Sequence, residues 1–376
     1  MIKCFKCGNE DIRYFGIRID GLYCRKCISF NGEEVDGFVS DSSAYKYNLN
    51  YKLSKEQKEI SNKTLSAFKK KKDVLIHAVC GAGKTELVFE CISYALKNKM
   101  NVGFVIPRKD VVIALYSRFK DVFRDNSIVS VYGGNTKNLK GDIILLTTHQ
   151  LYRYNEYFDL LIIDETDAFP FSGNDVLNNM FLKAVRGNYI MLSATPNNDM
   201  LELLNKRNGV YLKLLSRYHK HPLPVPKKII TIVDPLVFFI FYFRKFYVDK
   251  FQILVYVPTI KDGQKLMKTL KTVYKEGEFV SSKTRDRNTI IEDFKRGKYK
   301  YLITTSILER GITIPRVQVI VYKSDHVIFD KATLIQIAGR VGRKRDSPYG
   351  DVVFIAQNQS LEVEEAIKEI EEINNE

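Results

Sequence analysis

The segment from Asp73 to Thr85, DVLIHAVCGAGKT, decides the fold that the rest of the chain must adopt. Residues 74–79 are an apolar run of strand length, which predicts a buried parallel strand. Residues 80–83 can then turn so that successive backbone N–H groups point at a single anion. The segment therefore predicts a phosphate-binding loop at the carboxyl end of a strand.

The two residues that close this loop would complete a nucleotide site. Lys84 can reach the β- and γ-phosphates, and the hydroxyl of Thr85 can ligate Mg²⁺. A helix expected from about Glu86 would direct its positive end at the same phosphates. The pattern departs from G-x-x-x-x-G-K-[ST] at Ala78, which is small enough to replace the first glycine. The backbone contacts would come from Gly81, Ala82 and Gly83.

A second apolar run, Phe158 to Ile163, ends in the carboxylate pair Asp164 and Glu165. Open α/β sheets bind ligands at the carboxyl ends of their strands, so we expect this pair to lie near the phosphate loop. Asp164 would hold Mg²⁺ through its water shell, and Glu165 would polarise the attacking water. A solvated acidic turn is the alternative interpretation, and the presence of both motifs in one chain favours the catalytic one.

The composition is that of an ordinary soluble protein with an excess of positive charge. The 376 residues are 45% hydrophobic and 27% charged, with a formal net charge of +15. The excess is larger outside residues 361–376, which carry seven Glu against one Lys. Because 22 Tyr and 23 Phe can stack on bases, the charge favours a polyanionic partner. A solubilising surface is the alternative.

Four of the six cysteines form two C-x-x-C pairs separated by residues 8–23. This spacing predicts a zinc ribbon, with Asp20-Gly21 as the turn of a hairpin that brings the pairs together. The ligands would be Cys4, Cys7, Cys24 and Cys27. Two disulfides are the alternative, but with no signal peptide the chain is expected in a reducing compartment. The basic and aromatic residues of the ribbon suit contact with nucleic acid, and a purely structural ribbon is equally open.

Strand-like runs recur at a regular interval after the phosphate loop. They predict one doubly wound parallel sheet in an α/β domain. The runs are 73–79, 101–107, 142–148, 158–163 and 188–193. The residues at the ends of these strands, most of them polar, suit phosphodiester contact; they are Pro107 and Arg108, then Thr148 and His149. The longest strongly apolar segment of the chain, residues 236–243, is too short to span a bilayer.

A helix is expected just before the phosphate loop, capped by Ser54. It contains Gln57, whose amide can read the edge of an adenine base. Residues 29–50, rich in Ser, Asn and Asp, read as a linker between this helix and the ribbon.

The proline-rich end of residues 197–226 marks a boundary between two domains. We therefore predict a zinc-ribbon-like module and linker over residues 1–50, a first domain over 51–220 and a second over 221–376. His219 and His221 have no partner cysteines nearby, which favours a surface linker.

The second domain repeats the alternation of strands and helices without a phosphate loop. Between strands expected at 317–322 and 351–356 lies the segment QIAGRVGR, residues 336–343. Its arginine pair, Arg340 and Arg343, is interpreted as lying at a helix start and acting as an arginine finger on a γ-phosphate. A basic surface turn is the alternative.

These motifs, in this order, resemble those of superfamily 2 helicases across residues 51–356. They are Gln57, AVCGAGKT, PR at 107, TTHQ, DETD, SAT, TTSILERG and QIAGRVGR. Within that superfamily, the four-cysteine ribbon, TTHQLYRY, IIDETDAFP, HPLPVP, ITTSILERGITIP and GRVGRK followed by SPYGDVVF resemble ComFA, the late-competence ATPase of naturally transformable bacteria. The departures are Ala78 and the pair Thr166-Asp167 after the two carboxylates.

The resemblance implies two tandem RecA-like domains that use ATP, Mg²⁺ and Zn²⁺. It implies a DNA-dependent ATPase that drives import of single-stranded transforming DNA, located in the cytoplasm at the inner face of the cell membrane. Carried over by motif, Lys84, Thr85, Asp164 and Glu165 would do the chemistry, while Arg340 and Arg343 sense the γ-phosphate. Glu309, Gly311 and Gln336 would join the nucleotide site, and Thr148, Ser281 and Thr304 would touch DNA. Partners implied by the family are a ComFC-like protein and the ComEC channel.

Two other interpretations remain. One is a different ribbon-bearing helicase, such as a replication-restart helicase resembling PriA, although that family is longer and carries its zinc modules within the second motor domain. The other is a DNA-binding protein without catalysis, which the intact set of Lys84, Asp164, Glu165 and Arg343 disfavours.

Overall fold

The computed structural model describes residues 2–19, 21–35, 37, 44–166, 173–305 and 314–376. The chain forms two compact units. The first unit comprises Met1–Ala78 and Gly83–Leu214, and the second comprises Val79–Ala82 and Leu215–Glu376. The chain thus passes into the second unit at Leu215, a few residues before the predicted boundary.

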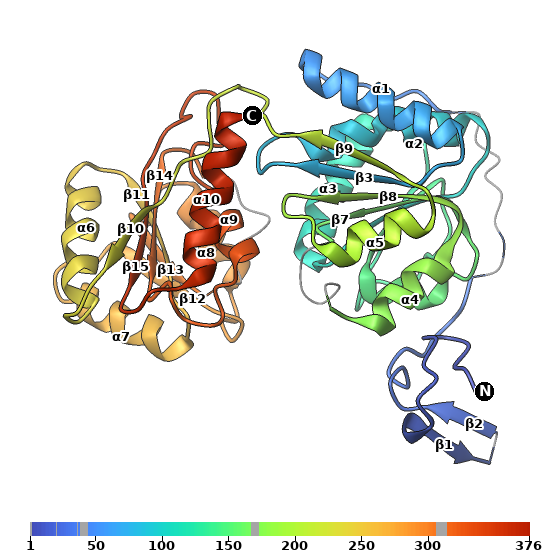
Figure 1. The fold of residues 1–376 in the computed structure, drawn as a ribbon, viewed down its shortest axis with the longest axis horizontal. Helices are drawn as coiled ribbons and strands as arrows, with labels where there is room; N and C mark the ends of the chain where they lie inside the picture. Colours follow the sequence, from blue (N-terminus) through green and yellow to red (C-terminus); the bar gives the residue numbers. More distant parts are fainter. Residues whose placement is uncertain (1, 20, 36, 38–43, 167–172, 306–313) are drawn as a thin grey trace. The chain divides into compact units, whose positions relative to one another are not determined.

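The first unit is built on a seven-stranded sheet in which all pairs are parallel (Figure 1). Its strands, in spatial order, are β5 (Ile128–Val131), β6 (Ile143–Thr147), β4 (Val102–Ile106), β7 (Phe158–Asp164), β8 (Val185–Ser193), β3 (Val74–Ala78) and β9 (Val210–Leu214). Every predicted strand of this domain is present. The parallel arrangement brings the carboxyl ends of β3 and β7 to the same edge, with β8 between them.

The central strands of this sheet are apolar at nearly every position, so both of its faces must be covered, and helices cover them. One face packs on α1 (Lys55–Lys69), α2 (Phe89–Lys97) and α3 (Lys109–Val122). There Phe104 of β4 meets Phe119 of α3, with ring centroids 5.4 Å apart. The other face packs on α4 (Asp175–Ala184), α5 (Asn198–Lys206) and the 3₁₀ helix η3 (Thr148–Arg153).

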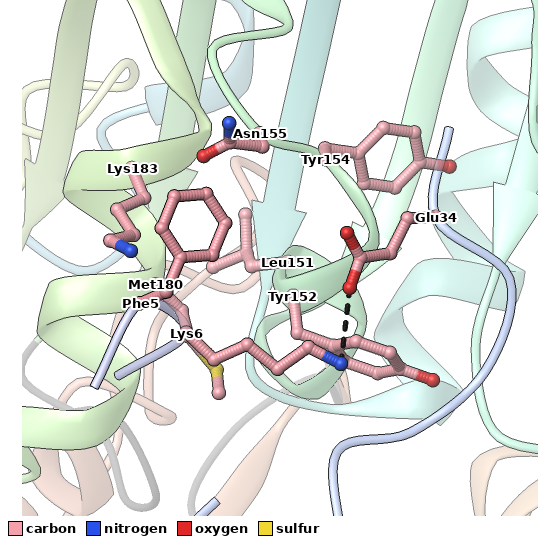
Figure 2. Close-up of a pocket in the computed structure, with 9 residues that line it drawn as sticks. All are labelled: Phe5, Lys6, Glu34, Leu151, Tyr152, Tyr154, Asn155, Met180 and Lys183. Atoms are coloured by element: carbon pink, nitrogen blue, oxygen red, sulfur yellow. Dashed lines mark ion pairs between the residues drawn. The ribbon is translucent and has the colours of Figure 1, made fainter. Parts of the chain in front are cut away.

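The N-terminal residues form a small module, with a 3₁₀ turn η1 (Ile12–Tyr14) and an antiparallel hairpin of β1 (Phe15–Arg18) and β2 (Gly21–Cys24). The hairpin that the sequence predicts between the two C-x-x-C pairs is thus confirmed. Cys7, Cys24 and Cys27 belong to the same buried cluster as Leu151 of η3 and Met180 of α4. In Figure 2, Phe5 lies beside Lys183, whose ammonium is 3.9 Å from the ring centroid. The module therefore shares a hydrophobic core with the first unit.

The second unit contains a six-stranded parallel sheet. Its order is β10 (Lys227–Ile230), β15 (Val352–Ala356), β14 (Val317–Tyr322), β11 (Gln252–Tyr256), β13 (Tyr301–Thr304) and β12 (Gly277–Val280). The helices are α6 (Leu236–Val248), α7 (Ile260–Lys271), α8 (Arg287–Lys295), α9 (Lys331–Ala338) and α10 (Leu361–Asn375). Phe239, Phe243 and Phe246 of α6 fill the core on one face.

Both units are thus α/β layers on a parallel sheet, which confirms the predicted fold class. Among the helices that the structure describes, none combines the length and apolarity that a membrane-spanning segment needs.

Candidate nucleotide and metal sites

The loop after β3 has the backbone of a phosphate cradle. Gly81 and Gly83 both have positive φ, +87° and +76°, which L side chains rarely adopt. The N–H of Ala82 donates to the carbonyl of Val79 at 3.1 Å, which closes a tight turn. Immediately afterwards a 3₁₀ helix, η2 (Lys84–Val88), begins and continues into α2. The helical stretch predicted from about Glu86 thus begins at Lys84.

Lys84 and Thr85 stand at the first turn of η2. The Lys84 ammonium donates to the carbonyl of Ala78 at 3.3 Å, so it folds back over the loop. Ala78 is the last residue of β3 and is fully buried. Its small side chain is accommodated in the strand, which explains how alanine can replace the usual glycine. Thr85 is also buried.

Gln57 is held beside the loop by its own helix cap. Ser54 and Gln57 form a reciprocal capping box, in which the Ser54 N–H donates to Gln57 Oε1 at 2.9 Å. A Cβ on Gly83 would lie 2.5 Å from Gln57 Nε2. The amide therefore lies directly against the phosphate loop, while its contact with adenine stays a prediction.

Asp164 and Glu165 emerge at the end of β7, as predicted. The Glu165 N–H donates to Asp164 Oδ1 at 2.9 Å. Glu165 has φ of +59°, an unfavourable conformation for a residue with a side chain. Such strain is found preferentially at functional sites, where the surrounding structure enforces it.

A polar cluster beside Thr85 was missed by the sequence interpretation. The buried carboxylate of Glu86 accepts hydrogen bonds from Arg118 of α3 and from the hydroxyl of Tyr51. A buried carboxylate requires such partners, since burial without them is costly. The cluster fixes the first helical turn after the loop. A Glu directly after the Lys-Thr pair was the available signal.

The residues predicted to touch DNA fall into two groups. Arg108 and His149 reach the surface; Arg108 pairs with Asp110 at 3.2 Å, and the His149 ring stacks on Phe30 with centroids 6.0 Å apart. The others are buried in this structure, namely Pro107, Thr148, Ser281 and Thr304. Contact of either group with DNA stays a prediction.

The arginine segment lies at the end of a helix, so the predicted helix start is wrong. α9 ends at Ala338, and Gly339 is its C-cap. Arg343 turns back to donate from Nε to the carbonyl of Gly339 at 2.8 Å. Arg340 is buried. Gln336, in the last turn of α9, accepts a hydrogen bond from Cys80 Sγ at 3.2 Å, both residues belonging to the second unit.

Arg217 and His219, in the segment interpreted as a surface linker, are bonded to the arginine segment. Arg217 is buried and donates to the carbonyls of Gly342 at 2.9 Å and of Gly339 at 3.4 Å. His219 Nε2 lies 3.0 Å from the carbonyl of Gly342. Burial lowers the pKa of Arg217 to about 10, so it keeps its charge at neutral pH. The two predicted nucleotide residues Glu309 and Gly311 lie outside the described residues.

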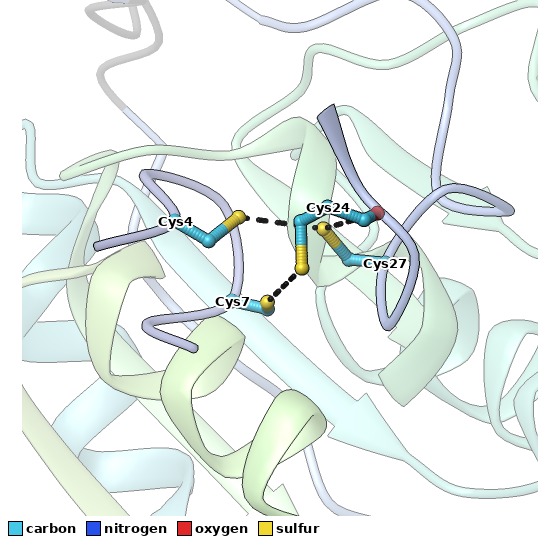
Figure 3. Close-up of side chains that lie close together, drawn as sticks. All are labelled: Cys4, Cys7, Cys24 and Cys27. Carbon is cyan, nitrogen blue, oxygen red and sulfur yellow. Dashed lines mark hydrogen bonds between the residues drawn. The ribbon is translucent and has the colours of Figure 1, made fainter. Parts of the chain in front are cut away.

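The four cysteines of the N-terminal module converge on one point (Figure 3). All four sulfur atoms lie within 4.8 Å of one another. The Cys4–Cys27 and Cys7–Cys24 sulfur pairs are 3.5 Å and 3.7 Å apart. Tetrahedral zinc with Zn–S bonds of about 2.3 Å places sulfurs about 3.8 Å apart, so the set fits Zn²⁺. These distances exceed a disulfide bond of about 2.0 Å, and all six cysteines are free.

The thiols of the cluster differ in pKa: although burial opposes the shift, hydrogen bonds from the backbone N–H of Cys7 and from the Cys27 thiol lower the pKa of Cys4. Burial, above all, raises the pKa of Cys7 to about 11, and burial together with the Cys4 and Cys7 thiols raises the pKa of Cys27. Four thiolates cannot be crowded together without a positive charge between them. A divalent ion would supply that charge.

Two sequence families match the chain. The family described as "Type III restriction enzyme, res subunit" matches residues 50–198, and "Helicase conserved C-terminal domain" matches residues 241–345. The two matches fall on the two parallel sheets.

Relatives resemble the chain over nearly its full length. Competence protein ComFA of Bacillus subtilis is 34% identical over 402 residues, covering 99% of this chain and 85% of that protein. ComFA of Streptococcus pneumoniae is 33% identical, covering 99% and 90%. Among solved structures, S. cerevisiae Dbp5 bound to RNA and ADP BeF3 gives a TM-score of 0.66 at 18% identity, covering 86% of this chain and 88% of that one. That last likeness shows the fold alone.

Proposed function

This chain belongs to the ComFA family of competence proteins, and from that premise we propose that it is an ATP-driven translocase that moves single-stranded transforming DNA into the cell. The chain is a helicase-type ATPase with two RecA-like domains, as the two helicase-domain matches and the fold indicate. Helicases of this class use ATP with Mg²⁺. The observation that carries the proposal is the identity of about one residue in three with ComFA proteins over 99% of the chain.

In the proposed reaction, the chain's own residues would bind the phosphates and Mg²⁺ and would orient and polarise the attacking water. Lys84 would leave the Ala78 carbonyl to contact the β- and γ-phosphates, while Thr85 and Asp164 hold Mg²⁺. Glu165 would orient the attacking water and accept its proton. The backbone N–H groups of residues 81–83 would supply the remaining phosphate contacts.

The second unit would contribute charge to the same reaction. Arg340 and Arg343 would stabilise the γ-phosphate as it transfers, the part an arginine finger plays. Gln336 would help to position the nucleotide, and Gln57 would contact the adenine. His149, which is exposed, and Arg108, which is partly exposed, would make the first contacts with the DNA strand.

Two finer parts of the proposal come from the family alone. The partners would be a ComFC-like protein and the ComEC channel, and the chain would work in the cytoplasm beside the membrane. Zinc would occupy the four-cysteine site, because the sulfur geometry fits a tetrahedral ion.

The test is ATP hydrolysis measured with and without single-stranded DNA, beside the variant Glu165→Gln. We expect wild-type turnover to rise with DNA. Glu165→Gln should lose turnover by about 100-fold or more yet still bind a fluorescent ATP analogue, because the change removes the base and keeps the shape. A wild type that binds DNA but hydrolyses no ATP would support a non-catalytic DNA-binding protein instead.

A further inference from the structure

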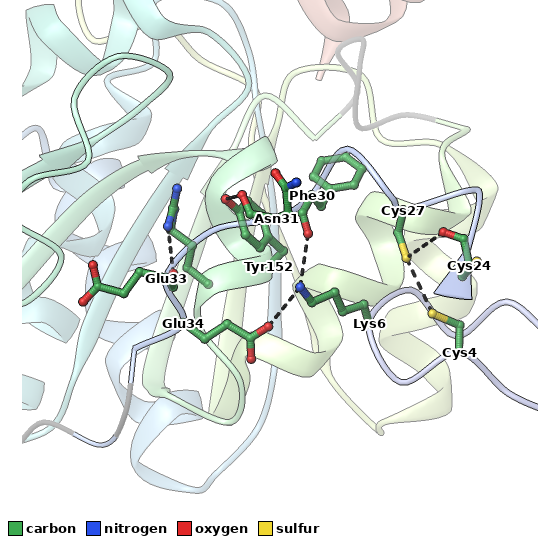
Figure 4. A network of polar contacts seen from close by, with 10 residues as sticks. Cys4, Lys6, Cys24, Cys27, Phe30, Asn31, Glu33, Glu34 and Tyr152 are labelled. Atoms are coloured by element: carbon green, nitrogen blue, oxygen red, sulfur yellow. Dashed lines mark hydrogen bonds and ion pairs between the residues drawn. The ribbon is translucent and has the colours of Figure 1, made fainter. Parts of the chain in front are cut away.

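The segment Phe30–Val35, which we call the strap, lies along η3 (Figure 4). It follows the last cysteine of the N-terminal four-cysteine module, residues 2–27, which we call the metal module because its sulfur geometry fits Zn²⁺. Three of its backbone carbonyls accept hydrogen bonds from side chains. Tyr152 Oη donates to the carbonyl of Asn31 at 2.7 Å. Arg153 Nη1 donates to the carbonyl of Glu33 at 2.7 Å, and Lys6 Nζ donates to that of Phe30 at 3.2 Å. Two of the three donors belong to η3.

Arg153, the last residue of η3, holds the strap from two sides. Its backbone carbonyl accepts from the N–H of Val35 at 2.7 Å, and its Nε donates to Gln150 Oε1 at 2.8 Å. The side chain is buried, and the acceptors that the structure gives it are neutral oxygens. A buried guanidinium without a carboxylate contributes little favourable energy of its own. Its forked donors instead fix where the strap and η3 lie relative to each other.

Gly32 shows how closely the strap approaches η3. Its φ is +146°, and an added Cβ would lie 2.8 Å from Tyr152 Oη and 2.9 Å from Arg153 Nη1. A side chain there would have to displace the Tyr152 hydroxyl and the Arg153 guanidinium, the two groups that bond to the strap, and would strain the backbone at this φ. By contrast, a Cβ on Gly37, five positions further along the chain and outside the strap, would meet nothing within 4 Å.

Side chains of Lys6 and Phe30 add further contacts between the strap, the metal module and η3. Lys6 of the metal module pairs with Glu34 at 3.0 Å and lies 5.6 Å from the Tyr152 ring centroid. The Phe30 ring stacks on His149, at an interplanar angle of 21°. The cavity left between module and η3 is about 20 Å³, room for about one water molecule. Residues 31–34 of the strap are exposed and Val35 is buried, so the strap lies on the surface of η3 and is held there mainly by its hydrogen bonds.

The first residue of the strap, Phe30, is bonded to the four-cysteine cluster. The N–H of Phe30 donates to the carbonyl of Cys27 at 3.0 Å, so the strap leaves the cysteine cluster within one turn. At its far end Val35 forms a parallel bridge with Tyr154, directly after η3. A chain of short contacts thus joins the four cysteines to the 3₁₀ helix that carries Thr148 and His149.

We propose that the strap is a brace through which the metal module holds η3 in the conformation that binds a single strand, with Arg153 as the positioning residue. The DNA-binding part of this inference rests on the proposed function, whereas the bracing of η3 does not. Loosening the strap should therefore affect η3 and DNA binding, and leave the phosphate loop and the metal content unchanged.

The experiment compares full-length Gly32→Ala and Arg153→Lys with wild type and with the matched control Gly37→Ala. Zinc content is measured by elemental analysis, ATP-analogue binding by fluorescence, and single-strand affinity by anisotropy. Hydrogen exchange reports on residues 148–153. Gly32→Ala and Arg153→Lys should keep the zinc content and the ATP-analogue affinity of wild type. Both should raise the hydrogen-exchange rate at residues 148–153 by about 10-fold and lower the affinity for single-stranded DNA by about 10-fold. Gly37→Ala should match wild type.

The outcomes separate the two ideas. Unchanged exchange in both test variants, or equal acceleration in Gly37→Ala, would overturn the brace. Faster exchange with unaltered strand affinity would overturn its link to DNA. A wild type that binds no single strand would refute the proposed function, while the exchange measurement would still decide whether the strap braces η3. Arg153→Lys keeps the test open if Gly32→Ala fails to fold.

Discussion

Two glycine-containing turns of this chain sit at opposite ends of helices. Residues 81–83 precede the helical stretch of η2 and α2, whereas residues 339–343 follow α9. A helix start presents unpaired N–H groups, and a helix end presents unpaired carbonyls. The first turn can therefore bind phosphate with its backbone, and the second cannot.

The second turn must bring its positive charge through side chains. Its carbonyls, at Gly339 and Gly342, are occupied by cationic or polar groups from Arg343, Arg217 and His219. Cations at a helix C-terminus are stabilised by the helix dipole. Similar Gly-and-basic sequences thus differ in what they present: backbone N–H groups at residues 81–83, and guanidinium groups bonded to backbone carbonyls at residues 339–343.

The strongest test of the cradle is Lys84→Ala. We expect losses of ATP-analogue binding and of kcat/KM, the latter by about 1,000-fold, because the lysine is the side-chain charge that the cradle adds to its backbone donors. Lys63→Ala on α1, an exposed lysine paired with Glu59, is the control and should behave as wild type. Retained turnover in Lys84→Ala would mean that residues 81–85 do not bind the phosphates.

The corresponding test of the second turn is Arg343→Ala. If the turn works only through its side chains, kcat should fall by about 1,000-fold while ATP-analogue affinity stays close to wild type. Arg345→Ala, an exposed arginine two positions later, is the matched control. If Arg343→Ala lost as much ATP-analogue binding as Lys84→Ala, the proposed difference between the two turns would be wrong.

The backbones of the two turns should differ in tolerance to a side chain. At Gly342, with φ of +67°, an added Cβ would lie 2.1 Å from the carbonyl oxygen of Pro348. At Gly81, with φ of +87°, the nearest atom is 3.8 Å away. Gly342→Ala should lower the free energy of unfolding by about 3 kcal/mol and Gly81→Ala by about 1 kcal/mol. Urea unfolding followed by fluorescence would measure both, and equal losses would contradict the argument.

The smallest expected effect is that of Arg217→Lys. A lysine keeps the charge but cannot reach both carbonyls with a planar fork, so about 1 kcal/mol of stability should be lost. Because the arginine segment would then be held less firmly, kcat should fall a few-fold with KM for ATP unaltered. A larger rise in KM than fall in kcat would place Arg217 in ATP binding rather than in support of the segment.

Much of the fold could be predicted because central parallel strands are apolar on both faces. β3, β4, β6, β7 and β8 were all predicted from apolar runs. The short strands β5 and β9 lie at the sheet edges, where only part of each strand is buried and the apolar run is broken. Periodicity cannot detect such strands without knowledge of their neighbours.

Residue type and spacing were enough to predict where Lys84 and Glu165 lie and that the four cysteines converge, as the structure shows, while their chemical roles stay predictions. The sequence could not distinguish a helix start from a helix end at residues 336–343, since glycine and arginine are compatible with both. Arg217 and the strap were missed for another reason. Their contacts run to backbone carbonyls, which every residue possesses and which therefore leave no trace in the pattern of side chains.

The core that the metal module shares with the first unit limits how such proteins can be recombined. Cys7, Cys24 and Cys27 pack in one cluster with Leu151 and Met180, so the two halves of that cluster are complementary surfaces in this chain. A chimera that joins the first 35 residues of one relative to the RecA-like domains of another would bring together side chains in this cluster that do not fit each other. Successful exchanges would need to transfer η3 and the facing side of α4 together with the cysteines.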